Sequence, residues 1–192
     1  MCAAAFVVDS YGFALTGLTP AEQSARERSL SRETRGGSWE KHLTRGVAGG
    51  KHRRGARRLK ELVRRGIPPE DRPRVWMILS GAEIRKNAFP VDYYAELLRQ
   101  IDPTEAEGID DETLRIFAQR LGVEGMEVVR RVLVAYGVHK EMTISGCGGI
   151  ASIVAFLTVV LGADREEDVF WMFLALIEKM LMNDSSIEVV PS

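Results

Sequence analysis

A glycine-rich segment, Ser145 to Ile150, separates two strongly apolar stretches and is the first place where chemistry is expected. It reads Ser-Gly-Cys-Gly-Gly-Ile. The stretch before it runs from Val128 to Tyr136, and the one after it from Ile150 to Leu161. A loop that leads into a buried helix presents backbone N–H groups at a fixed place. The segment itself offers mostly glycines, so reactive side chains must come from other parts of the chain.

Several common kinds of site do not fit this segment. No Lys-Ser/Thr pair follows the glycines, so they do not form a nucleotide-binding P-loop. Ser145 has no base placed beside it, which argues against a nucleophile. His42, His52 and His139 are too dispersed to share a metal with the two cysteines. We therefore expect no metal and no cofactor.

The charge is balanced overall and uneven locally. The 192 residues carry a net charge of −1, which gives no general attraction to nucleic acid. Lys41 to Arg65, however, holds ten Lys/Arg and one acid, Glu61. This segment is either a solvated linker or a patch for acidic lipid headgroups or an acidic protein face. Two cysteines give no disulfide framework, which indicates a reducing, cytoplasmic setting.

Hydrophobic spacing predicts an all-α fold of helices joined by short loops, without strands. Thr19-Pro20-Ala21-Glu22 is typical of a helix start, and Gly81 is typical of a helix end. Ile150–Leu161 is apolar but too short to span a membrane, which takes about 20 residues. The predicted helices after the basic segment are 59–65, 70–80, 93–98, 109–121, 123–136, 150–161 and 165–182. We divide the chain into an irregular basic region with one polar helix (1–56), a helical domain (57–182) and a tail (183–192).

Three motifs occur in an order that resembles the TBC domain, the Rab GTPase-activating family. The first is Gly-Ile-Pro followed by Arg-x-x-Val-Trp, the second is Arg-Val-Leu-Val-Ala-Tyr, and the third is Glu-Glu-x-x-Phe-Trp. Trp-Met-Ile-Leu-Ser-Gly-Ala at 76–82 is similar to the growth-hormone-regulated members. The resemblance covers about 57–182 and implies a multi-helix orthogonal array, the N-terminal half of the family domain. It also implies that these motifs bind the GTPase or support the fold. The motif residues assigned in this way are Gly66, Ile67, Pro68, Arg72, Trp76, Phe170 and Trp171.

The resemblance implies acceleration of GTP hydrolysis on a bound GTPase. In this family an arginine neutralises charge on the phosphate oxygens in the transition state, and a glutamine orients the attacking water. The family pattern Ile-x-x-Asp-x-x-Arg corresponds to Ile109, Glu112 and Arg115, with Glu in place of Asp. These residues share one helix face, where Glu112 would orient Arg115 through an ion pair. The alternative is that Arg115 is an ordinary surface residue of an amphipathic helix.

The glutamine expected from the resemblance is missing. The family has Gly-Tyr-Cys-Gln-Gly-Met where this chain has Ser-Gly-Cys-Gly-Gly-Ile at 145–150. Gly146 therefore occupies the tyrosine position and Gly148 the glutamine position. Glycine has no side chain with which to orient water. The chain also ends soon after the Glu-Glu-x-x-Phe-Trp helix. Only the N-terminal half of the family domain is therefore expected, with apolar faces of Ile150–Leu161 and Val169–Leu181 exposed.

Together these features predict a GAP-like regulator of Rab-family GTPases in vesicle trafficking, with a degenerate catalytic motif and weak or absent activity. The alternative is a non-catalytic Rab-binding or helical interaction module. We expect a regulator and not an enzyme with its own substrate. The expected partners are a GTP-bound Rab-type GTPase and an acidic membrane surface at 41–65, with no nucleic acid. The expected location is cytoplasmic, including the periphery of endomembranes.

Overall fold

The computed structural model describes residues 53–100, 111–141 and 148–184, together with positions 19, 21, 22, 24, 25, 28 and 39. Within the helices, some side chains, including those of Glu112 and Arg115, lie outside the described set. The chain divides into two compact units, Met1–Ile78 and Leu79–Ser192, and each is considered by itself. The predicted domain bounds stay a prediction.

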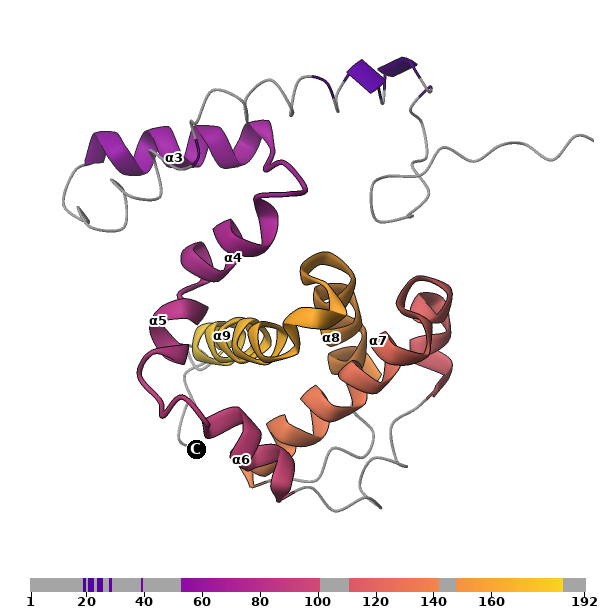
Figure 1. The fold of residues 1–192 in the computed structure, drawn as a ribbon. Helices are drawn as coiled ribbons and strands as arrows, with labels where there is room; N and C mark the ends of the chain where they lie inside the picture. Colours follow the sequence, from indigo (N-terminus) through magenta and orange to yellow (C-terminus); the bar gives the residue numbers. More distant parts are fainter. Residues whose placement is uncertain are drawn as a thin grey trace, which may run out of the picture. The chain divides into compact units, whose positions relative to one another are not determined.

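The described residues form helices and turns without a strand, so the all-α prediction is confirmed (Figure 1). No helix among them combines the length and apolarity needed to cross a bilayer. The elements are α3 (Arg53–Arg65), α4 (Arg72–Ser80), α5 (Ala82–Lys86), α6 (Tyr93–Arg99), α7 (Asp111–Lys140), α8 (Gly148–Leu161), the short 3₁₀ helix η2 (Ala163–Arg165) and α9 (Glu166–Asp184).

In the first unit, two helix ends follow directly from side-chain chemistry. The Glu22 N–H donates to Thr19 Oγ1 at 3.3 Å, and the Thr19 N–H donates to Glu22 Oε2 at 2.8 Å. This reciprocal capping confirms the predicted helix start at Thr19. Helix α3 begins at Arg53, four residues before the predicted start of the helical domain at Arg57. It ends before Gly66, whose φ is 111°. Such a φ favours glycine.

In the second unit, α9 is the central helix of the core. It contacts α5, α7 and α8 (Figure 1). Its side chains from Val169 to Ala175, and that of Ile177, are all buried. The expected exposed apolar face on Val169–Leu181 is therefore wrong for this part of α9. On α8 the same expectation is met at one residue, because Phe156 is 40% exposed.

Two glycines shape the chain around this core. Gly81 has φ 82° and ends α4 as expected, but a further short helix, α5, follows it immediately. Gly122 lies inside α7 with φ 62° and ψ −172°, a combination that is essentially confined to glycine. It divides α7 into the two helices that hydrophobic spacing predicted. The segment that carries Arg115 therefore has a direction of its own.

Candidate functional site

The two positions with predicted catalytic roles lie on helices that pack against each other. Arg115 and Glu112 belong to the part of α7 before Gly122, and Gly148 is the first residue of α8. Helices α7 and α8 are in contact. The side chains of Arg115 and Glu112 are not among those described, so their roles stay predictions.

The start of α8 has room for a larger side chain. Gly149 is exposed, and a Cβ added to it would meet no atom within 4 Å. Helix α8 contains no acidic residue in its first turn. A side chain added at Gly149 would therefore meet no steric clash. A polar group in this first turn would also have no neighbouring carboxylate in the same turn.

The Gly-Ile-Pro motif forms a turn that is fastened by the arginine following it. The Gly66 N–H donates to the Val63 carbonyl at 3.1 Å, and Ile67 is buried. Arg72 donates its Nε–H to the Ile67 carbonyl at 2.7 Å. Hydrogen bonds to charged groups are stronger than neutral ones, so this contact holds the entry into α4. Pro68 is buried as well, and the half-buried Trp76 lies within α4. These contacts give the first motif a structural role.

The Glu-Glu-x-x-Phe-Trp motif supplies core residues. Phe170 is 0% exposed and Trp171 is 1% exposed. The Trp171 indole donates to Glu167 Oε1 at 3.1 Å, and its ring lies 5.0 Å from that of Phe89. Both side chains are thus unavailable to a partner protein in this structure. Their contribution is to fix α9 against its neighbours.

The first glutamate of the same motif ties three helices together. Arg131 on α7 donates two hydrogen bonds to the Glu166 carboxylate, one from Nε at 2.9 Å and one from a terminal nitrogen at 2.6 Å. The Tyr94 hydroxyl on α6 donates to the same carboxylate at 2.8 Å. Burial raises the pKa of Tyr94, and the charge of Glu166 raises it further. Tyr94 received no role from the sequence, and Arg131 was noted only as the first residue of the Arg-Val-Leu-Val-Ala-Tyr motif. The available signal was the charged pair Arg130-Arg131 inside the otherwise apolar stretch from Val128 to Tyr136.

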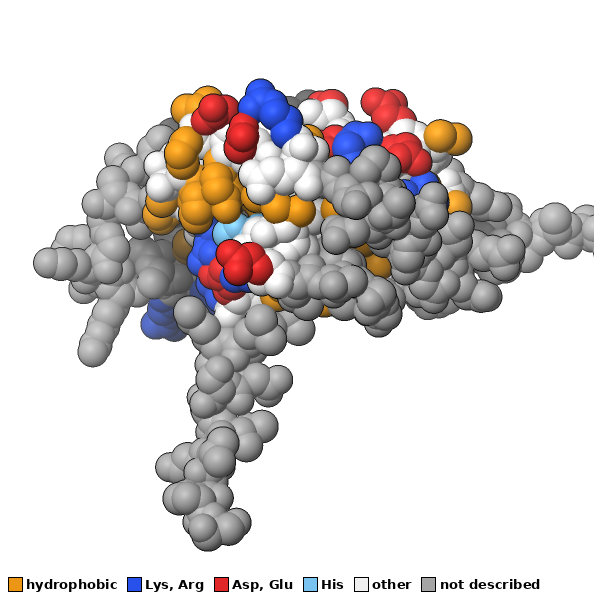
Figure 2. All heavy atoms as spheres, turned by 90° about the horizontal axis from the view of Figure 1, so that it is seen from below, with side chains coloured by type: hydrophobic (Ala, Val, Ile, Leu, Met, Phe, Trp, Pro, Cys, Tyr) orange, Lys and Arg blue, Asp and Glu red, His pale blue; other side chains and the backbone are white. Residues whose placement is uncertain are grey.

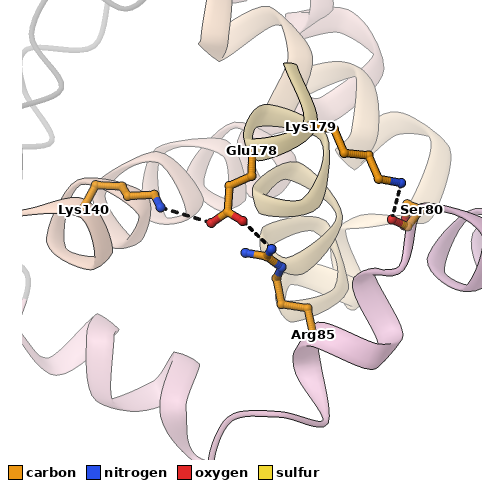
Figure 3. Close-up of polar contacts among 5 residues, drawn as sticks. All are labelled: Ser80, Arg85, Lys140, Glu178 and Lys179. Carbon is orange, nitrogen blue, oxygen red and sulfur yellow. Dashed lines mark hydrogen bonds and ion pairs between the residues drawn. The ribbon is translucent and has the colours of Figure 1, made fainter. Parts of the chain in front are cut away.

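A second charged cluster fastens α5 to α9 (Figure 3). Glu178 pairs with Arg85 on α5 and with Lys140 at the end of α7, the latter at 3.1 Å. Lys179 donates to the Ser80 carbonyl at 2.8 Å. Burial tends to raise the pKa of Glu178, but the hydrogen bonds from Arg85 and Lys140 outweigh it and leave that pKa below its ordinary value.

We expect Glu178→Ala to lower the free energy of unfolding by about 1 kcal/mol, because exposed ion pairs contribute up to about 1 kcal/mol each. The variant loses the ion pairs with Arg85 and Lys140 together, and the Glu178 side chain that forms them is only 18% exposed. Urea unfolding measures the change. Glu96→Ala is the matched control, since it removes a pair with Arg99 that is far more exposed. An equal loss in the two variants would contradict the expectation.

His139 lies at the edge of the aromatic core. Its Nδ1 is 2.7 Å from the Tyr93 hydroxyl, and its ring meets Phe89 and Phe170 edge-on. Figure 2 shows hydrophobic side chains gathered on one face of the molecule with charged side chains around them. His139 is half-buried. The ring is therefore accessible on one side and enclosed by apolar groups on the other.

The free energy of unfolding should fall as the pH drops below about 6.5, the ordinary pKa of histidine. Burial lowers the pKa of His139, Lys140 and Arg85 lower it further, and Glu178 opposes them. Since the unfolded histidine binds a proton at higher pH than the folded one, protons favour unfolding below that value. Urea unfolding of the wild type and His139→Gln at neutral and mildly acidic pH measures the difference. If both proteins show the same pH dependence, His139 is not the group responsible.

Comparison with known proteins gives a consistent assignment. The family model of the Rab-GTPase-TBC domain matches residues 69–189. Growth hormone-regulated TBC protein 1 of Homo sapiens is 30% identical over 132 residues, which are 66% of this chain and 38% of that protein. Growth hormone-regulated TBC protein 1-A of Danio rerio is 32% identical over 130 residues, or 65% and 36%. The chain thus spans less than two fifths of the length of these relatives.

A solved structure agrees with the sequence matches. The crystal structure of the Chlamydomonas flagellar RabGAP TBC domain superimposes with a TM-score of 0.66 at 28% identity, covering 90% of this chain and 59% of that chain. A GTPase-activating domain takes part in GTP hydrolysis and is counted as catalytic. Our expectation of a regulator that is not an enzyme was therefore wrong as a classification of the domain.

The resemblance that the sequence motifs suggested is confirmed by the family match, by the similarity to growth hormone-regulated TBC proteins and by the shared fold. On this evidence, the chain belongs to the Rab-GTPase-TBC domain family.

Proposed function

We propose that this chain binds a Rab-type GTPase in its GTP-bound form and accelerates GTP hydrolysis weakly, through Arg115. The observation that carries the proposal is the pairing of a retained arginine pattern on α7 with a glycine at the glutamine position on α8. The first of the family's two reacting groups is therefore present in the sequence, and the second is absent.

The chemistry of the arginine favours residual activity. A guanidinium is planar, permanently charged and forked, which suits the oxygens of a transferring phosphate. An arginine given in trans to a GTPase is worth about 10³–10⁵ in rate. Glu112, one helical turn before Arg115, is proposed to orient it through an ion pair. Gly148 offers no amide to hold the attacking water, so the acceleration is expected to be incomplete.

A second candidate is a binding module without activity, and Gly148 is the observation that favours it. In that case the chain would retain a surface for the GTPase while the nucleotide is hydrolysed only at its intrinsic rate. Binding and hydrolysis therefore have to be measured separately.

Single-turnover GTP hydrolysis with a panel of GTP-loaded Rab GTPases distinguishes the two. Acceleration above the intrinsic rate of at least one GTPase supports the first candidate. Binding of a GTP-loaded GTPase without acceleration supports the second. Absence of both binding and acceleration across the panel would overturn the proposed function.

We further propose a cytoplasmic location at the periphery of endomembranes. The support is the reducing setting suggested by a sequence with only two cysteines, too few for a disulfide framework, and the surplus of Lys and Arg in 41–65. Fractionation of cells that express the chain, into cytosol and membrane pellets, tests this location. Recovery of the chain from the culture medium would contradict this location.

A further inference from the structure

Helix α3 carries a row of cations on one face. Arg57, Lys60 and Arg64 are exposed, and their spacing of three and four residues puts them on the same side of the helix. Leu62, which is 9% exposed, falls on the opposite side. The row extends over about 10 Å at the helical rise of 1.5 Å per residue. The exposed Glu61, four residues after Arg57, is the one acid of this helix and lies on the same side. Helix α3 therefore turns Leu62 inward and presents three cations and one carboxylate to solvent on this side, a net positive charge.

The charge on this helix is strongly biased. Its thirteen residues, RRGARRLKELVRR, contain seven Arg or Lys and a single acid. The whole chain, by contrast, has a net charge of −1. The surplus is thus a local property of α3 and the residues before it. A local surplus of this kind attracts an anionic surface within about 10 Å at ordinary ionic strength.

We propose that the face formed by Arg57, Lys60 and Arg64 binds the anionic surface of a lipid bilayer. Phosphate headgroups on a flat surface require only charge, which arginine and lysine supply. Protein interfaces rest on buried aromatic or apolar anchors, and the binding of single-stranded nucleic acid on stacking aromatics. The net charge of −1 gives the chain no general attraction to the phosphates of a duplex. Helix α3 contains no aromatic residue. Val63, which is 40% exposed next to the row, adds an apolar contact suited to the headgroup boundary.

This inference specifies the element behind the peripheral location proposed above. Each basic residue near an anionic membrane contributes about fivefold to binding. The triple variant Arg57→Gln, Lys60→Gln, Arg64→Gln should therefore bind on the order of 100-fold more weakly. The full chain is sedimented with phosphatidylcholine vesicles, with and without phosphatidylserine. The wild type should bind only the phosphatidylserine vesicles and should be released by salt.

The control variant carries the same change in charge outside α3: Arg99→Gln, Arg120→Gln and Arg165→Gln. All three residues are exposed. This variant should bind as the wild type does, and circular dichroism should show equal helix content in all three proteins. Unchanged vesicle binding in the α3 variant, or an equal loss in the control, overturns the proposal. Because the assay contains no GTPase, its failure is independent of the proposed Rab interaction.

Discussion

Arg115→Ala is expected to return GTP hydrolysis on the partner GTPase to its intrinsic rate. The loss equals the whole acceleration that the wild type gives, and it should be no larger than about 10³, the lower end of the range for an arginine supplied in trans, because the second reacting group is already missing. The physical reason is that alanine leaves the negative charge building on the phosphate oxygens without a counter-charge. Single-turnover hydrolysis, with this chain in excess over the GTP-loaded GTPase, measures the effect.

Two companion variants make this result specific. Arg115→Lys keeps a positive charge but not the planar fork, so it should recover only a small part of the rate. Arg120→Ala removes another arginine from α7, one with an exposed side chain, and should hydrolyse as the wild type does. Binding of the GTP-loaded GTPase should persist in all three. Full acceleration by Arg115→Ala would remove the assigned role of this residue.

Gly148→Gln should raise the rate of hydrolysis by about 10², the usual worth of one well-placed hydrogen-bonding group in a transition state. The amide would be supplied from the first residue of α8, where the family places its glutamine. It would hold the attacking water in line with the phosphate. The same single-turnover assay, with wild type and variant at equal concentration, measures the gain.

The neighbouring glycine provides the matched control. Gly149→Gln adds an identical side chain at an exposed position with no atom within 4 Å of the new Cβ. Successive helical residues point about 100° apart, as 3.6 residues per turn requires, so this amide should miss the water. Any gain from replacing a helical glycine would appear in both variants. Equal rates for the two would show that position 148 has no special place in catalysis.

Local signals in the sequence were sufficient for most of the helix boundaries. Thr19 and Glu22 predicted a helix start because capping depends on residues three apart. The break near Gly122 was visible because the apolar spacing is interrupted there. Short-range rules of this kind need no knowledge of the rest of the fold.

Contacts between distant segments were not accessible in the same way. Helix α5 has only five residues, too few for a periodic pattern, yet it contacts α9 and holds Arg85 near Glu178. The uncovered face that we expected on α9 followed from the missing second half of the family domain, and nothing in the sequence indicated that α5 contacts α9. The grip of Arg131 on Glu166 joins residues that are 35 apart in the chain, and neither side chain reveals its partner from sequence.

The predicted site was accessible only through family motifs. Arg115 has a spacing that many amphipathic helices share, and Gly148 is informative only against a pattern that contains glutamine. Phe170 and Trp171 show the limit of this approach. The motif assigned them either to GTPase binding or to structural support, and their burial favours structural support. Motifs identify positions, whereas burial and contacts distinguish what each position does.

The break at Gly122 separates two kinds of evolutionary constraint. The part of α7 after it, with Val128, Val129 and Val132 fully buried, is bound by the needs of the core. The part before it continues through one residue whose φ of 62° and ψ of −172° are tolerated by glycine. Replacing this glycine would redirect the segment bearing Arg115 while the core side chains stay unchanged. A residue that takes no part in the reaction can therefore control where the proposed arginine lies.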